Sequence, residues 1–102
     1  MAGNRADLSV ILREVLGSEN CYFEPPASIR MSYPCIVYER SSIDPVRADD
    51  SAYIMHKRYS VMAIYEDPDD DLPDRIANLP YCEHDRHYTV DNLHHDIFTL
   101  YF

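Results

Sequence analysis

The chain has 102 residues, the length of one domain, and 46% of them are hydrophobic, so it can bury a thin but real core. Its formal net charge is −9, and its nine basic residues are scattered among eighteen acidic ones, which argues against ordinary nucleic-acid binding. With two glycines there is no glycine-rich phosphate loop, and no apolar run approaches the roughly 20 residues of a membrane span.

Residues 4–17 are predicted to form a helix with one buried stripe. The apolar residues recur at helical spacing: Leu8, Ile11, Leu12, Val15 and Leu16. Asn4 or Asp7 is expected to cap the start, and Gly17 to end the helix. The opposite face is assigned to the polar residues Arg5, Ser9, Arg13 and Glu14. The preceding residues lack the apolar core of a signal peptide, so folding in a cytoplasm is expected.

Two strand candidates follow, at 21–24 and 33–40, the first ended by Pro25. The three cysteines, Cys21, Cys35 and Cys82, are odd in number and widely spaced. That pattern argues against a disulfide framework and fits a reducing compartment. Cys35 lies in an apolar run and is expected to be a buried free thiol.

Residues 41–52 are polar and turn-forming, and they are long for a connection in a compact domain. Two interpretations remain open for this segment. It is either a large hairpin arm or a loop that a partner orders.

Residues 53–66 are predicted to form a long strand, in which Tyr59, Val61, Ala63 and Tyr65 face one way. An acidic break follows, with Asp71 as the expected N-cap of a short helix that ends before Pro80. Residues 81–90 and 94–102 are predicted to form a hairpin around Asp91 and Asn92.

These elements indicate a single α+β domain, 1–102. We expect a mostly antiparallel sheet of four to five strands, with the N-terminal helix and the second, short helix packed on it.

Potential metal ligands gather on the two arms of the terminal hairpin: Cys82, His84, His87, His94, His95 and Asp96. Because neighbours along a strand point to opposite faces, Cys82 and His84 are expected on one face and His87 on the other. His94 and His95 are separated in the same way. Four convergent ligands are therefore not expected, so no metal and no cofactor are predicted, and the histidines are assigned to subunit contacts.

No enzyme is predicted, because nothing resembles a nucleophile elbow or another catalytic signature. Asp85 with Arg86, or Asp96 with a neighbouring histidine, is expected to form a cross-strand salt bridge. The acidic run consists of Asp67, Asp69, Asp70 and Asp71. It lacks the glycine and the terminal glutamate of an EF-hand loop and is interpreted as a solvated turn with a helix cap, or as an acidic surface with a purpose.

Nine tyrosines and three phenylalanines are too many for one thin core to hide fully. Tyrosine is favoured at interfaces because it has an apolar body and a polar tip. The aromatic excess therefore favours an oligomer.

Three blocks of sequence resemble those of small bacteriophage neck and tail proteins, of the tail terminator or tail-completion type. They are residues 31–40 (MSYPCIVYER), residues 57–69 (KRYSVMAIYEDPD) and residues 79–102 (LPYCEHDRHYTVDNLHHDIFTLYF). The resemblance implies a structural virion protein that forms a ring, by family analogy hexameric, at the head-proximal end of the tail tube. Such a ring ends tube growth and joins the tail to the head connector.

The resemblance also implies partners and a location. The chain would contact its own copies, the tail tube protein and a connector or stopper protein, with DNA passing through without specific binding and no membrane involved. It would fold in the host cytoplasm and reside in the virion. The alternatives are a head-completion or stopper protein, or a small metal-binding or regulatory cytoplasmic protein.

On this interpretation, the oligomer or tube contacts are Asp44, Arg47, Asp49, Asp50, His94, His95, Tyr101 and Phe102. The acidic lumen or surface consists of Asp67, Asp69, Asp70 and Asp71. Phe102 belongs to the predicted strand 94–102, and the N-terminal helix or a neighbouring subunit is expected to cover it.

Overall fold

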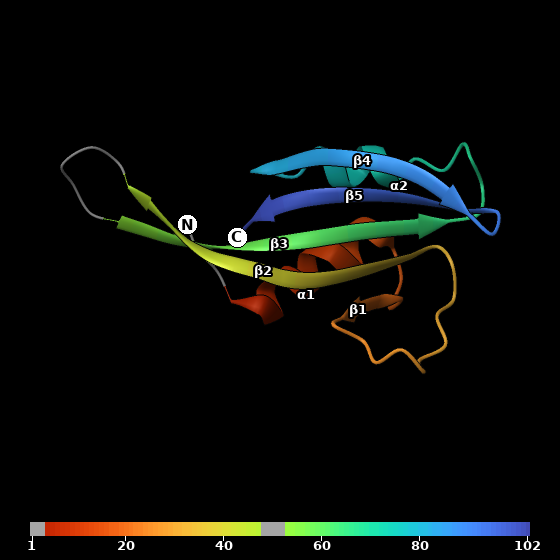
Figure 1. The fold of residues 1–102 in the computed structure, drawn as a ribbon, viewed down its shortest axis with the longest axis horizontal. Helices are drawn as coiled ribbons and strands as arrows, with labels where there is room; N and C mark the ends of the chain where they lie inside the picture. The colour runs from red at the N-terminus through yellow and green to blue at the C-terminus, as the bar shows by residue number, and fades with distance from the viewer. Residues whose placement is uncertain (1–3, 48–52) are drawn as a thin grey trace.

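The computed structural model describes residues 4–47 and 53–102 (Figure 1). The elements, in chain order, are α1 (Arg5–Leu16), β1 (Cys21–Phe23), β2 (Cys35–Arg47), β3 (Tyr53–Tyr65), α2 (Leu72–Ala77), β4 (Cys82–Val90) and β5 (Leu93–Tyr101). None of the helices in the described chain is long and apolar enough to cross a membrane.

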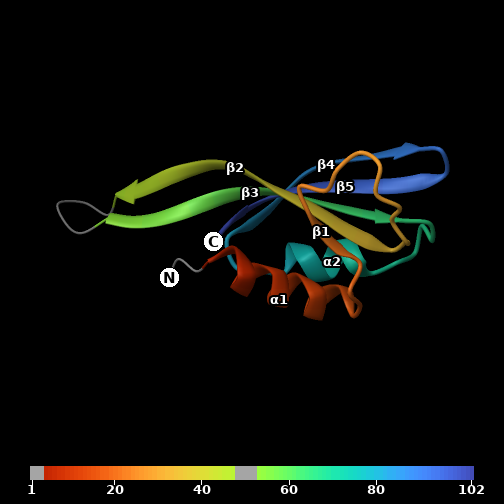
Figure 2. The same cartoon turned by 90° about the horizontal axis from the view of Figure 1, so that it is seen from below.

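The strands form one sheet in the order β1-β2-β3-β5-β4. β1 pairs with β2 in parallel, and the other three pairs are antiparallel. Both helices lie on the same face of the sheet (Figure 2). The predicted α+β class is confirmed: the sheet has five strands, it is mixed, and it is mostly antiparallel.

The helix α1 begins and ends where its sequence predicts. The Asn4 side chain accepts a hydrogen bond from the Asp7 amide at 2.9 Å, and Gly17 ends the helix at a φ of 82°. The assignment of Ser9 to the exposed face was wrong, because Ser9 is buried. Its hydroxyl forms a hydrogen bond with the buried hydroxyl of Tyr38, which allows a small polar residue to enter the packed face.

The core lies between the helices and the sheet. Tyr59, Val61, Ala63 and Tyr65 are buried on the helix side of β3, as their alternation predicted. The other side chains of this core are Leu8, Leu12, Leu16, Cys21, Ile36, Tyr38, Leu72, Ile76, Phe98 and Leu100.

The acidic run forms the turn that starts α2. Asp71 is at the N-cap position, but the capping hydrogen bond comes from its neighbour: the Asp70 carboxylate accepts from the Leu72 amide at 2.9 Å. Arg75 contacts Asp71 at 3.2 Å and donates to the Val15 carbonyl at 2.6 Å, which ties α2 to the end of α1. The interpretation as a turn with a helix cap is confirmed.

The terminal hairpin turns at Asp91 and Asn92, with φ values of 54° and 63°, as a tight two-residue turn requires. The prediction that His84 and His87 face opposite ways was wrong. The register between β4 and β5 shifts between His84 and Arg86, because Asp85 is an extra residue at a bulge. Because of this extra residue, His84 and His87 lie on the same face of β4.

Residues 41–47 continue β2, and residues 42–47 pair with β3, so the interpretation as a hairpin arm is confirmed for this part of the segment; residues 48–52 lie outside the described residues. Figure 1 shows this arm beyond the helices and beyond β4 and β5. Pro45, which lies opposite Met55, favours a turn by its residue type. Proline is tolerated here because the outer edge of β2 pairs with no described strand at this point.

We predict that Ser9→Ala lowers the free energy of unfolding by about 1–3 kcal/mol, because it leaves the buried Tyr38 hydroxyl without this partner. Adding Tyr38→Phe should recover part of that loss by removing the unsatisfied group. Urea denaturation of the two single variants and of the double variant measures the coupling. Strictly additive effects would contradict the predicted coupling.

Candidate functional site

The candidate assembly surface begins with the arm, which we define as β2 residues 43–47 and β3 residues 53–57. β1 pairs with β2 from Cys21 to Phe23 and stops opposite Tyr38. On the other side, β5 follows β3 as far as Phe102, which exchanges backbone hydrogen bonds with Lys57 at 3.0 and 3.2 Å. Most of the arm therefore consists of two strands that pair with each other and with no other strand of the described chain. Such a ribbon offers main-chain groups on both edges.

The arm carries two of the predicted contact residues. Asp44 stands opposite His56, and Arg47 stands opposite Tyr53 at the last pair. Asp49 and Asp50 lie outside the described residues. The structure thus brings Asp44 and Arg47 onto one projecting element.

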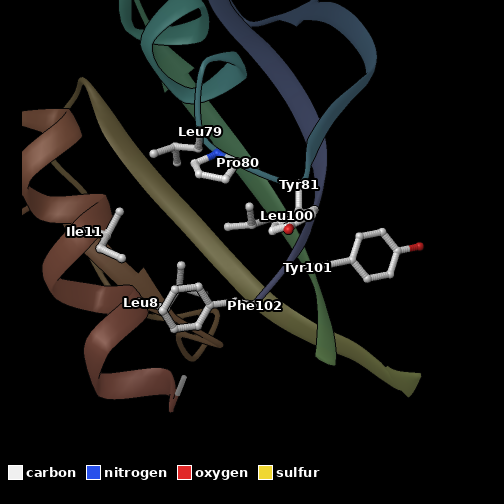
Figure 3. Close-up of a pocket in the computed structure, with 8 residues that line it drawn as sticks. All are labelled: Leu8, Ile11, Leu79, Pro80, Tyr81, Leu100, Tyr101 and Phe102. Carbon is white, nitrogen blue, oxygen red and sulfur yellow. The ribbon is translucent and has the colours of Figure 1, made fainter. Parts of the chain in front are cut away.

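An apolar groove lies near the base of the arm, between α1, the α2–β4 connection and the end of β5 (Figure 3). Its volume is about 220 Å³, and its lining is Leu8, Ile11, Leu79, Pro80, Tyr81, Leu100, Tyr101 and Phe102. In Figure 3 the ring of Phe102 lies beside Leu8, whereas the ring of Tyr101 points away from them. Helix α1 therefore packs against Phe102, which is half-buried, and cover by a neighbouring subunit stays a prediction.

The predicted contact residues His94 and His95 lie on opposite faces of β5, as expected. His94 is on the helix side, where its ring stacks on Tyr65 and on His87 at centroid distances of 5.3 and 5.5 Å. His95 is on the open face and stacks on Tyr88 at 4.6 Å. Both rings therefore make contacts within their own chain.

A polar network surrounds Asp96, whose exposed fraction is 4%. The Tyr65 hydroxyl donates to Oδ2 of Asp96 at 2.5 Å. Nε2 of His84 and Nδ1 of His87 donate to Oδ1 at 2.8 and 3.0 Å. Three strands thus meet at one carboxylate, and the predicted pairing of Asp96 with a neighbouring histidine is confirmed.

The network shifts two pKa values in opposite directions. Burial raises the pKa of Asp96, but hydrogen bonds from Tyr65, His84 and His87, together with the positive charge of His87, outweigh burial and lower it. Burial and the hydrogen bond to Asp96 raise the pKa of Tyr65, so this tyrosine stays protonated and donates.

The described residues contain neither a thiol with a lowered pKa nor a cluster of side chains suited to a metal ion. Burial raises the pKa of Cys21 and Cys82 to about 11 and that of Cys35 to about 12, so all three thiols are protonated at neutral pH. No group of three or more His, Cys, Asp or Glu side chains within 4–47 and 53–102 is placed to hold a metal ion.

Part of the acidic run stabilises the turn before α2, and part of it is exposed to solvent. Asp67 accepts from the Asp69 amide at 2.9 Å, and Asp70 is half-buried against α2. Asp67, Asp69 and Asp71 are exposed. The predicted acidic surface thus coincides with the turn before α2.

Sequence reasoning missed the role of Tyr65 and the shared partner of His84 and His87. Alternation placed Tyr65 in the core, but no local signal showed that a carboxylate 31 positions later would accept its hydrogen bond. The sequence of β4 contains no glycine or proline that would have indicated the bulge at Asp85. Both features depend on cross-strand register.

Comparisons with models of protein families, with curated proteins and with solved structures found no match for this chain.

We predict that Asp96→Asn lowers the free energy of unfolding at pH 7 by about 1.5–3 kcal/mol, because hydrogen bonds to a charged, buried acceptor are lost. The folded-state pKa of Asp96 lies below its unfolded value of about 3.9. The carboxylate therefore stabilises the fold above that value, and the stabilisation is lost as the pH falls through the lower folded pKa.

Urea denaturation between pH 3 and pH 7 measures both effects. The Asp96→Asn variant should lose less stability on acidification than the wild type, and Tyr65→Phe, which keeps the carboxylate, should lie between them. Equal acid sensitivity of wild type and Asp96→Asn would contradict the assignment.

We also predict that Phe102→Ala lowers the free energy of unfolding by about 1–2 kcal/mol, because the ring is partly buried against the core. Tyr101→Ala is the matched control, since its ring points away from Leu8 and Phe102. Thermal and urea unfolding should rank Phe102→Ala as the less stable variant; the reverse order would contradict the packing of Phe102.

Proposed function

We propose that this chain is a structural virion protein of the tail terminator type, which forms a ring at the head-proximal end of a phage tail and joins the tail to the head connector. The proposal covers the partners that the sequence suggests: copies of the same chain in a ring that is hexameric by family analogy, the tail tube protein and a connector protein. DNA would pass through the ring without specific binding.

The observation that carries the proposal is the arm. A head-to-tail ring needs two different contact surfaces on each subunit, one that projects and one that receives it. The arm is a projecting element whose backbone edges are unpaired within the described chain over most of its length. A two-stranded ribbon is only marginally stable by itself, so contact with a neighbour would stabilise it.

The charge of the chain supports the same proposal. The formal net charge is −9, and the exposed carboxylates of Asp67, Asp69 and Asp71 gather at one turn. A conduit with negative walls repels the phosphate backbone and lets DNA move without binding.

A head-completion or stopper protein of the connector is the second candidate, favoured by the same arm. Both functions require a ring, and they differ in the neighbour that the ring contacts. Electron microscopy of particles with a labelled subunit separates them, because the terminator touches the tail tube and the stopper touches the portal side.

We predict that reversing the charges of two predicted contact residues, Arg47→Glu in the arm and Asp50→Lys outside the described residues, weakens ring assembly and leaves the monomer folded. Loss of polar rim contacts should raise the concentration needed for assembly about tenfold or more. Light scattering coupled to size-exclusion chromatography measures the oligomer, and circular dichroism reports the fold.

The matched control is Glu14→Lys, on the exposed face of α1. This variant should assemble like the wild type. Normal rings and normal virion tails from the arm variant would overturn the assignment of the arm as a subunit contact.

A further inference from the structure

β4 is the most weakly buried of the long strands whose side chains the structure describes. It forms one edge of the sheet and pairs with β5 alone. Seven of its nine residues are exposed, whereas every residue of β5 is buried or half-buried, with alternation from Asp96 to Tyr101. Detaching β4 would therefore expose little apolar surface, and segments of this kind open at low free energy.

Two of the three side-chain bonds that hold β4 on the helix side converge on one atom, and the third, between Thr89 and His94 at 3.2 Å, is exposed. Nε2 of His84 and Nδ1 of His87 both donate to Oδ1 of Asp96, at 2.8 and 3.0 Å. The bulge at Asp85 makes this possible, because it turns the two histidines to the same face. Both imidazoles are nearly half-exposed, while the carboxylate that they share is buried.

On the open face of the hairpin, the Tyr88 ring stacks on His95 at 4.6 Å, and its hydroxyl donates to Sδ of Met62, a weak acceptor, at 3.7 Å. Thr99 donates to the Asp85 carboxylate at 2.7 Å, and this bond is exposed to water. Water competes well for exposed hydrogen bonds, so this bond contributes little to holding the strand. The buried acceptor of the helix side is the stronger anchor.

We propose that β4 is an edge strand that opens locally from β5, and that Asp96 is the latch that keeps it closed through His84 and His87. Opening breaks the backbone ladder of β4 and both imidazole–carboxylate bonds, while the core under α1 stays packed. It uncovers the backbone edge of β5 that pairs with β4, from Leu93 to Leu100.

The three thiols of the chain are placed to test this proposal. Cys82 is the first residue of β4, whereas Cys21 and Cys35 are buried at β1 and at the start of β2. Local opening of β4 would free Cys82 alone, and global unfolding would free all three. Labelling with excess Ellman's reagent under native conditions, followed by peptide mass spectrometry, gives a rate for each thiol.

In the wild type, we expect Cys82 to react faster than Cys21 and Cys35. The double variant His84→Ala with His87→Ala should raise the Cys82 rate about tenfold or more, because both latch bonds are lost, and leave the other two rates unchanged. His84→Gln with His87→Asn keeps a side-chain N–H at both positions and should restore a slow rate. Thr99→Val, on the open face, is the matched control and should react like the wild type.

Hydrogen exchange of the peptide that spans residues 83–90 should follow the Cys82 rate in every variant. Equal rates for the three thiols in the wild type would overturn the proposal, because β4 would then open only with the whole domain. An alanine double variant in which all three rates rise together, or in which the Cys82 rate stays constant, would overturn it as well.

Discussion

Unequal strand lengths divide this sheet into a part that carries the core and a part that projects from it. β2 and β3 have thirteen residues each, β4 and β5 have nine, and β1 has three. Where all five strands overlap, the sheet is wide enough to support both helices and a core. Where β2 and β3 continue alone, they form the arm, which has no layer of helices over it (Figure 2). One mismatch in length therefore separates a stable body from a projecting element available for contact.

Within the described residues, the body of the domain contains two buried polar side chains on its helix side, Ser9 and Asp96. Each has partners: the Tyr38 hydroxyl for Ser9, and Tyr65 with two histidines for Asp96. A buried polar group is tolerated only when its hydrogen bonds are made, so each network restricts which registers of the sheet are acceptable. The Asp96 network joins β3, β4 and β5, and it fixes the position of the edge strand β4 relative to β3 at the centre of the sheet.

Local patterns in the sequence were sufficient wherever one residue type has one conformational preference. Asn4 and Gly17 mark the ends of α1, and Asp91 with Asn92 marks the hairpin turn, because these residues suit caps and positive φ values. Patterns were insufficient for residues 41–47, where Pro45 and the polar residues indicate a turn but the chain remains extended. There, pairing with β3 outweighed local preference, since an arm with unpaired edges accepts residues that a central strand would reject.

Periodicity and short-range backbone preference were enough to predict the α+β class, the buried face of β3, the start and end of α1 and the terminal hairpin. The sequence also predicted a pairing between Asp96 and a histidine. Only the tertiary structure decided that β1 joins the sheet in parallel, that Ser9 is buried, and that His84 and His87 share one carboxylate. These features depend on register between segments far apart in the chain, and a single extra residue at Asp85 reverses the face that alternation assigns to His87.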